Sequence, residues 1–132
     1  MRRSAGFTLV ELLVVLAVLG LLVALVGPLT ADRLDKARAQ EEWLILERTV
    51  TGLAFRAFAE GREVELRAEG TRLTWMLGGD EPRVLNLERV FFDPSQTVRI
   101  NTNGLATPAE LKLQLAGRSR SLQLNRWLED GK

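Results

Sequence analysis

The sequence GFTLVELLVVLAVLGLLVALVGPL, at Gly6–Leu29, is the most distinctive stretch of this 132-residue chain. Between Leu12 and Gly27 it contains no polar side chain, and one carboxylate, Glu11, stands directly before that apolar run. A helix over Phe7–Leu29 would be roughly 34 Å long at ~1.5 Å per residue, which is enough to cross the hydrocarbon core of a bilayer. We therefore expect a transmembrane helix with a single acidic side chain near one end.

The position of Glu11 needs a physical reason, because a carboxylate near the end of a membrane span is costly unless it finds a partner. We therefore treat Glu11 as a candidate functional residue that requires a cation. A secretory signal peptide fits poorly, since a small-x-small cleavage site should follow its apolar region. Gly27–Thr30 offers no such site. The small residue that could mark cleavage is Gly6, which lies ahead of the apolar run.

The residues on both sides of Gly6 form a specific pattern. Arg2–Gly6 reads RRSAG, and Phe7–Leu13 reads FTLVELL. This pattern resembles the class III signal of type IV pilins and type II secretion pseudopilins. The resemblance implies that a prepilin peptidase cleaves after Gly6 at the cytoplasmic face, and that the new N-terminal residue, Phe7, is N-methylated.

The same resemblance assigns an assembly role to Glu11, which matches the invariant glutamate of the family, and to Pro28, which matches a proline that the family often has. Cleavage would leave an ammonium group at Phe7. When subunits stack, this amine of one chain can meet the carboxylate of a neighbour, and each group offsets the burial of the other. Glu11 would then set the register of insertion into a filament. The alternative is an ordinary N-terminal anchor whose glutamate reaches the lipid headgroups.

The implied partners are the prepilin peptidase, other pilin or pseudopilin subunits and the inner-membrane assembly platform. Both leader arginines, Arg2 and Arg3, lie before the apolar segment. Basic residues on this side favour a cytoplasmic N-terminus, so that the rest of the chain lies outside the inner membrane. We therefore expect a single-pass inner-membrane protein that is later assembled into a pilus or pseudopilus.

Composition argues against most enzymatic chemistry. The chain has no cysteine and no histidine, so the common metal, thiol and imidazole-based sites lack their residues. We expect a protein that is not an enzyme and that has no cofactor and no metal. The absence of cysteine also excludes the disulfide that closes a C-terminal loop in many major pilins, which favours a minor pilin or pseudopilin.

The helical pattern continues beyond the apolar segment to Glu60, where Gly61 is a natural C-cap. An apolar stripe at helical spacing is expected to face a core, broadened by Phe55 and Phe58; its members are Trp43, Leu46, Val50, Leu53, Ala54 and Ala57. The opposite face is expected to carry solvated charge, namely Asp32, Asp35, Lys36, Arg38, Glu41, Glu42, Glu47 and Arg48.

After Gly61 the apolar period changes to two, which predicts short antiparallel strands. We expect Val90–Phe92 to be ended by Asp93-Pro94 and Val98–Ile100 to form a separate strand. In the last hairpin, Leu111, Leu113 and Leu115 are expected to face Leu122 and Leu124 across a turn at Gly117-Arg118. The prediction is an α+β, pilin-like fold in which a long N-terminal helix packs on a small antiparallel sheet. Its expected parts are a leader at 1–6, a transmembrane half at 7–29, an amphipathic half at 30–60 and a β-rich head at 61–132.

The head gives a weaker resemblance. Its strand order, its Asn103-Gly104 turn and its final hairpin resemble H-type minor pseudopilins and FimT-like minor pilins. That group commonly has an apolar-Phe-x-Pro-x-Gly segment, which here corresponds to Phe91–Gln96, with Gln96 where glycine is usual. The machine served, a type II secretion system or a type IV pilus, is left open, as is a membrane-anchored domain that does not polymerise.

A further alternative is DNA binding for natural transformation. Gly117–Arg120 reads GRSR, which matches the Gly-Arg-x-Arg pattern associated with DNA binding in FimT-like minor pilins. Arg118 and Arg120 would share one face of a strand and could contact phosphates, and Arg126 could extend the patch. The structural alternative is that a hairpin turn takes glycine for geometry and charges for edge protection. Once Arg2 and Arg3 are removed, 16 basic side chains remain against 17 acidic ones, whereas DNA-binding domains are usually more basic.

Overall fold

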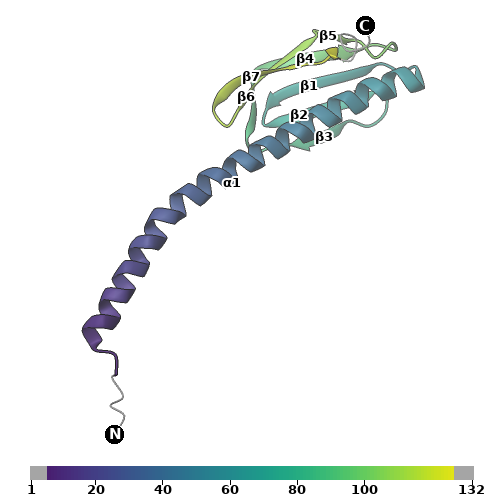
Figure 1. The fold of residues 1–132 in the computed structure, drawn as a ribbon. Coiled ribbons are helices and arrows are strands. Elements are labelled where there is room, and N and C mark those ends of the chain that lie inside the picture. Colours follow the sequence, from purple (N-terminus) through teal and green to yellow (C-terminus); the bar gives the residue numbers. More distant parts are fainter. Residues whose placement is uncertain (1–5, 127–132) are drawn as a thin grey trace. The chain divides into compact units, whose positions relative to one another are not determined.

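In the computed structural model, which describes residues 6–126, one long helix is followed by the strands of a seven-stranded antiparallel sheet (Figure 1). This confirms the predicted fold class. The elements are α1 (Leu9–Glu60), β1 (Val64–Gly70), β2 (Arg72–Leu77), β3 (Arg83–Asn86), β4 (Val90–Ile100), β5 (Ala106–Thr107), β6 (Glu110–Leu115) and β7 (Arg118–Gln123). Most of the leader lies outside the described residues, as do Trp127 and the acidic pair Glu129-Asp130.

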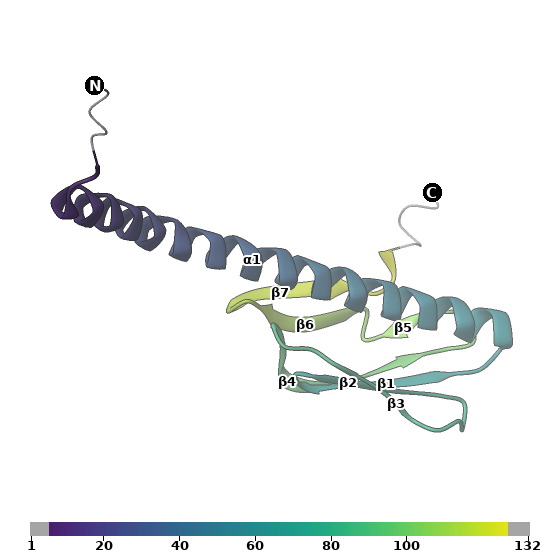
Figure 2. The ribbon, with the colours of Figure 1, turned by 90° about the horizontal axis from the view of Figure 1, so that it is seen from below.

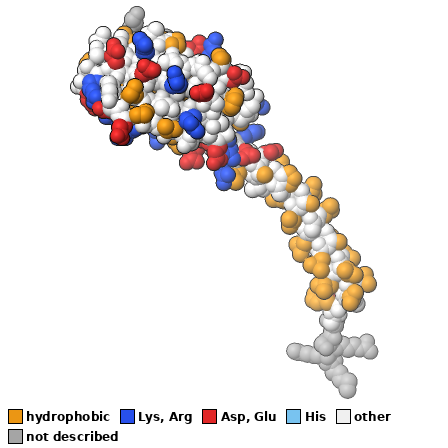
Figure 3. All heavy atoms as spheres, turned by 180° about the vertical axis from the view of Figure 1, so that it is seen from behind, with side chains coloured by type: hydrophobic (Ala, Val, Ile, Leu, Met, Phe, Trp, Pro, Cys, Tyr) orange, Lys and Arg blue, Asp and Glu red, His pale blue; other side chains and the backbone are white. Residues whose placement is uncertain are grey.

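The described chain forms two compact units with a boundary between Asp35 and Lys36, and α1 contributes to both. In the first unit, every described side chain is exposed, including the whole apolar run from Leu12 to Leu29. Figure 3 shows these hydrophobic side chains around the helix surface. The helix of this unit therefore buries none of its apolar surface within the chain itself.

The second unit, called the head from here on, contains the sheet and the part of α1 from Lys36 to Glu60. Its strand order is β3-β2-β1-β4-β6-β7, and β5 pairs with β4. This part of α1 runs along one face of the sheet (Figure 2). Alternate residues of β1, β4 and β6 point into the core beneath the helix, as the period of two predicts.

The apolar stripe of α1 faces this core as predicted, with Leu46, Val50, Leu53, Ala54 and Ala57 all buried. The expected contribution of the two phenylalanines is wrong. Phe55 is 69% exposed and Phe58 is 64% exposed. For Phe55 the reason is geometric, because a helix turns by roughly 100° per residue and Phe55 therefore lies on the side opposite Leu53.

The prediction that Glu42 is solvated is also wrong. Its carboxylate accepts hydrogen bonds from the backbone N–H groups of Glu88, Arg89 and Val90, at N···O distances of 2.8 to 3.3 Å. Its side chain is only 16% exposed, and the Arg89 guanidinium lies 4.0 Å away. Three consecutive N–H groups that converge on one anion form a nest. Glu42 therefore ties α1 to the start of β4.

Strand β4 does not end at Asp93-Pro94, as the sequence had suggested, but continues through it to Ile100. On the neighbouring strand β1, Ala68 pairs with Gln96 and Gly70 pairs with Phe92, so the register shifts in a bulge at this point. Pro94 lies in the bulge, where it interrupts no ladder hydrogen bond. The N-terminal end of β4 pairs with β6, through Val90 and Phe91.

Two side-chain amides, one beside this bulge and one at the other end of β4, bond the backbone of a strand. The amide of Gln96 bonds both the N–H and the C=O of Lys112 on β6, at 2.9 and 2.7 Å. In the same manner, Asn125 bonds both backbone groups of Ala106 on β5, at 2.8 and 3.0 Å. Each side-chain amide thus makes the pair of hydrogen bonds that the backbone of a neighbouring strand makes in a regular sheet.

The last hairpin turns one residue earlier than expected. Ala116 and Gly117 both have positive φ angles, 49° and 77°, as a two-residue type I′ turn requires. Leu115 pairs with Arg118, Leu113 pairs with Arg120, and Leu111 pairs with Leu122. Arg118 is consequently the first residue of β7 and not a turn residue.

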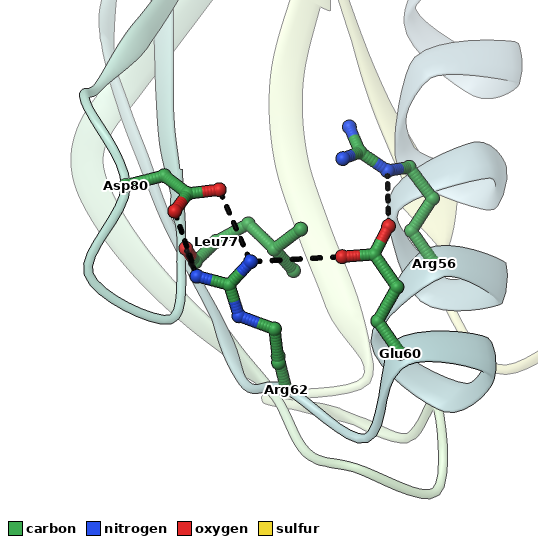
Figure 4. A network of polar contacts seen from close by, with 5 residues as sticks. All are labelled: Arg56, Glu60, Arg62, Leu77 and Asp80. Atoms are coloured by element: carbon green, nitrogen blue, oxygen red, sulfur yellow. Dashed lines mark hydrogen bonds and ion pairs between the residues drawn. The ribbon is translucent and has the colours of Figure 1, made fainter.

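Gly61 ends α1 as predicted, with φ 62° and a hydrogen bond from the N–H of Arg62 to the C=O of Ala57. Figure 4 shows that Arg62 then bonds Asp80 with two nitrogens, at 2.7 and 3.2 Å. These hydrogen bonds, followed by the charge of the guanidinium, lower the pKa of Asp80 below its usual range. The pair ties the end of α1 to the β2–β3 turn.

Candidate functional site

The N-terminal segment Gly6–Glu11 begins with three residues that precede α1. Thr8 occupies the N-cap position, because its C=O accepts the first helical hydrogen bond, from the N–H of Leu12 at 3.2 Å. The hydroxyl of Thr8 accepts a hydrogen bond from the N–H of Glu11 at 3.2 Å. In return, the N–H of Thr8 donates to Oε2 of Glu11 at 3.0 Å. The two residues form a reciprocal capping box.

The capping box is a feature that the sequence analysis missed. Its signature, Thr8-x-x-Glu11 directly before an apolar run, is present in the sequence. It gives Glu11 a partner within its own chain, which reduces the cost of a carboxylate at the head of the span. The sequence analysis had considered only a cation as the partner of Glu11.

The two residues that flank the expected cleavage point lie outside the helix. Phe7 is 89% exposed. A Cβ added at Gly6 would meet no atom within 4 Å. The structure therefore places Gly6, Phe7 and Glu11 together at the start of α1, in positions that an enzyme or another chain can reach.

Pro28, the second predicted assembly residue beside Glu11, does not belong to this cluster. It lies within α1, seventeen residues after Glu11, which corresponds to about 25 Å along the helix axis. Two residues further on, the hydroxyl of Thr30 donates to the C=O of Val26 at 2.7 Å. The polar side chains at both ends of the apolar run, Thr8 and Glu11 at one end and Thr30 at the other, are thus bonded to backbone groups of their own helix.

Arg118 and Arg120, the candidate DNA contacts, share one face of β7 as expected. That face is the core side of the sheet, because directly opposed residues of an antiparallel pair point the same way, and their partners Leu115 and Leu113 are buried. The guanidinium of Arg120 lies 5.6 Å from the ring centroid of Trp43 on α1, within the range of a cation–π interaction.

Arg126 is not part of the same cluster. It follows the other end of β7, beyond Gln123, and borders a pocket with Glu47, Thr51 and Leu122. All three arginines remain exposed to solvent. The structure therefore gives Arg120 a packing role against Trp43, and it does not bring the three cations into one compact patch.

Two properties of the described residues bear on the class of protein. Within residues 6–126, no group of three or more acidic, histidine or cysteine side chains is placed to hold a metal ion. Over the same residues, α1 is the one helix that is long and apolar enough to cross a membrane, judged by length and composition. An exposed apolar helix headed by an accessible Gly6–Phe7 bond and followed by an α+β head is consistent with a membrane-anchored protein.

The comparison with protein families supports this class. Residues 1–27 match the family model described as the prokaryotic N-terminal methylation motif. The match supports the type IV pilin and pseudopilin family for this chain, and with it processing by a prepilin peptidase and assembly with other pilins. It covers the expected cleavage site and most of the apolar run, and it ends before the head. Neither the curated proteins nor the solved structures gave a match.

Proposed function

We propose that this chain is a non-enzymatic structural subunit, a minor pseudopilin or minor pilin, of a type II secretion pseudopilus or a type IV pilus. The observation that carries the proposal is the first unit of the chain. Its helix exposes every apolar side chain from Leu12 to Leu29, and the N-terminal methylation motif stands at its head. Lipid would cover this surface before assembly, and the helices of neighbouring subunits would cover it in the filament.

In this function the chain is first a substrate. The prepilin peptidase would hydrolyse the bond between Gly6 and Phe7, so that water is consumed, a carboxylate forms at Gly6 and an amine forms at Phe7. N-methylation of that amine would follow. The head would lie outside the inner membrane, and the subunit would wait in the bilayer until the assembly platform inserts it into the filament.

Glu11 has the hydrogen-bonding capacity for its proposed second partner. The capping box uses Oε2 for one hydrogen bond, from the N–H of Thr8. A carboxylate has about four acceptor sites on its two oxygens. The ammonium group of a neighbouring Phe7 can therefore bind the same carboxylate without opening the box, and the pair would fix the axial register of the two chains.

The test is the incorporation of Glu11 variants into filaments, measured by immunoblotting of sheared filament fractions from a strain that lacks the wild-type chain. Glu11→Gln keeps the length of the side chain and can still close a capping box, but it carries no charge. We expect both Glu11→Gln and Glu11→Val to be lost from filaments. Glu11→Gln, which can keep the capping box, should be cleaved normally, whereas Glu11→Val removes the acceptor of the Thr8 N–H and should be cleaved less efficiently. Asp32→Asn, which removes an exposed charge from the same helix, serves as the matched control and should assemble normally.

Assembly of Glu11→Gln at the wild-type level would contradict the charge role of Glu11. Absence of the wild-type chain itself from the filament fractions would favour the remaining alternative, a membrane-anchored domain that does not polymerise. Which machine the subunit serves can be read from the same strain, because loss of the chain should impair either protein secretion or pilus-dependent functions.

The second candidate function, DNA binding in natural transformation, is favoured by the exposure of Arg118, Arg120 and Arg126. The full chain in detergent would be titrated with duplex DNA at several salt concentrations. If DNA is the ligand, affinity should fall steeply with salt and should be lost in the double variant Arg118→Gln with Arg120→Gln. Arg83→Gln with Arg99→Gln removes two exposed arginines elsewhere on the head and serves as the control. No binding at low salt would eliminate this function.

A further inference from the structure

The start of α1 stands in a fixed relation to the proposed cleavage site. The helix begins at Leu9, and the first carbonyl that it bonds is that of Thr8. The carbonyl of Gly6, which the peptidase must attack, therefore lies two residues ahead of the first bonded carbonyl. The susceptible peptide bond is thus kept just outside the hydrogen-bond ladder of the helix.

The capping box sets the N-terminal start of the helix at Thr8. An N-cap residue has non-helical backbone angles, and Thr8 is held there by two reciprocal hydrogen bonds with Glu11. Upstream of Thr8, the residues of an N-cap type are Gly6 and Ser4, and a cap at either would bring the C=O of Gly6 into the helical ladder. A helix that began from Ser4 would bond the C=O of Gly6 to the N–H of Val10, since helical bonds join residue i to residue i+4.

We propose that Thr8 is a positioning residue for the proteolytic processing of this chain. Its capping box with Glu11 fixes the start of α1 and so keeps the Gly6–Phe7 bond in a non-helical, accessible conformation for the peptidase. This inference rests on the proposed function, because it requires the prepilin peptidase as the enzyme that cleaves the bond. It also gives Glu11 two separable roles, one in capping through hydrogen bonding and one in assembly through charge.

The physical reason is that a peptidase needs a free backbone. Proteolysis concentrates where the backbone is exposed and is not bonded into an element, and a helical bond must open before it can be cut. If only a fraction of the substrate has the accessible conformation, the apparent affinity of the enzyme falls by that fraction. A shift of the helix start across Gly6 should therefore raise KM and leave kcat unchanged.

The experiment uses the full-length precursor in detergent micelles with a purified prepilin peptidase, and cleavage is followed by intact mass. Thr8→Val keeps the branched shape of threonine and removes its hydroxyl. Thr8→Ser keeps the hydroxyl and removes the methyl group. From the stabilisation that an N-cap provides, we expect Thr8→Val to raise KM roughly fivefold with kcat unchanged, and Thr8→Ser to restore the wild-type value.

Amide hydrogen exchange in the same micelles provides an independent readout. In the wild-type chain, the N–H groups of Leu9 and Val10 belong to the first turn and have no helical acceptor. In Thr8→Val they should gain protection, because the helix would extend toward the N-terminus. In Thr8→Ser they should exchange as in the wild type.

The proposal is overturned if Thr8→Val has the wild-type KM, or if Thr8→Ser is cleaved as poorly as Thr8→Val. A fall in kcat alone would also overturn it, because it would place the hydroxyl in contact with the peptidase in the transition state. These outcomes leave the proposed function intact. A wild-type chain that is not cut after Gly6 would instead remove the proposed function, and this inference with it.

Discussion

The two units of this chain treat apolar side chains in opposite ways. In the head, α1 buries one stripe against the sheet, where Leu46 and Leu66 are fully enclosed. In the first unit, the same helix exposes leucines and valines on every side. Burial of apolar surface is the dominant stabilising term of a folded domain. The head is therefore stabilised by apolar contacts among its own residues. The first unit has no surface to pack against within the described chain, and the proposed membrane anchoring and filament assembly would supply one from outside.

Polar groups show the same contrast. At the ends of the apolar run, Thr8, Glu11 and Thr30 are satisfied by the backbone of their own helix, at sequence separations of three or four residues. In the head, Glu42 is satisfied by N–H groups that lie 46 to 48 residues away. These polar side chains of the first unit are therefore satisfied locally, whereas Glu42 in the head depends on long-range contacts.

The largest difference should appear in a matched pair of leucine substitutions. Leu46→Ala empties space in the core of the head and should lower the free energy of unfolding by about 2–5 kcal/mol. Leu22→Ala, in the exposed apolar run, should change it by less than about 0.5 kcal/mol. Urea unfolding of the full chain in micelles, followed by the fluorescence of Trp43 and Trp75, measures both. Equal effects at the two positions would remove the contrast between the units.

A second pair compares adjacent glutamates on α1. Glu42→Ala leaves three backbone N–H groups without their acceptor and should destabilise the head by roughly 2 kcal/mol. Glu41→Ala changes an exposed side chain and should have an effect of less than about 0.5 kcal/mol. Glu42→Gln should fall between them, since its amide oxygen still accepts. The same unfolding assay applies, and a wild-type value for Glu42→Ala would mean that water replaces the carboxylate at no cost.

The two hydrogen bonds from the Gln96 amide on β4 to Lys112 on β6, called the amide clasp, should contribute less to the free energy of unfolding. Gln96→Ala removes both hydrogen bonds to Lys112 and should cost about 1–2 kcal/mol. Gln114 is an exposed glutamine on β6 itself, and Gln114→Ala is the control. Amide exchange at Lys112 should accelerate in Gln96→Ala and remain unchanged in the control. Unchanged protection at Lys112 would show that the clasp is not needed to hold the two strands together.

The smallest expected effect concerns pH. Because the folded-state pKa of Asp80 is lowered, the pair with Arg62 contributes stability above the unfolded pKa of the carboxyl group. That contribution is lost as the pH falls below about 4, through the folded value. Asp80→Asn should flatten the acid side of the stability profile slightly, and the addition of Arg62→Ala should flatten it no further. The pair is exposed, so the change should be small.

Local patterns in the sequence predicted much of this structure. The helical spacing from Leu46 to Ala57, the period-two strands after Gly61 and the C-cap at Gly61 all depend on neighbouring residues, and all are found in the structure. The capping box was equally local, and its Thr8-x-x-Glu11 signature could have been recognised. The prepilin-type motif belongs to the same class of local signal.

Two of the errors, at Glu42 and at Asp93-Pro94, have a different cause, which is that distant residues decide the outcome. Nothing near Glu42 in the sequence indicates the three N–H groups that bind it. Asp93-Pro94 is typical of a strand end, and only the bulge against β1 allows β4 to continue. The left-handed conformation of Ala116 moved the last turn by one residue. This shift placed Arg118 opposite Leu115 in the ladder.

The most direct test of the account is the mature N-terminus. Intact mass and N-terminal sequencing would be applied to the chain purified from membranes of strains with and without the prepilin peptidase. The account predicts a chain that begins with N-methylated Phe7, found only when the peptidase is present. A chain that still begins at Met1, or that is cut at another bond, would remove the amine proposed to pair with Glu11 and would contradict the account.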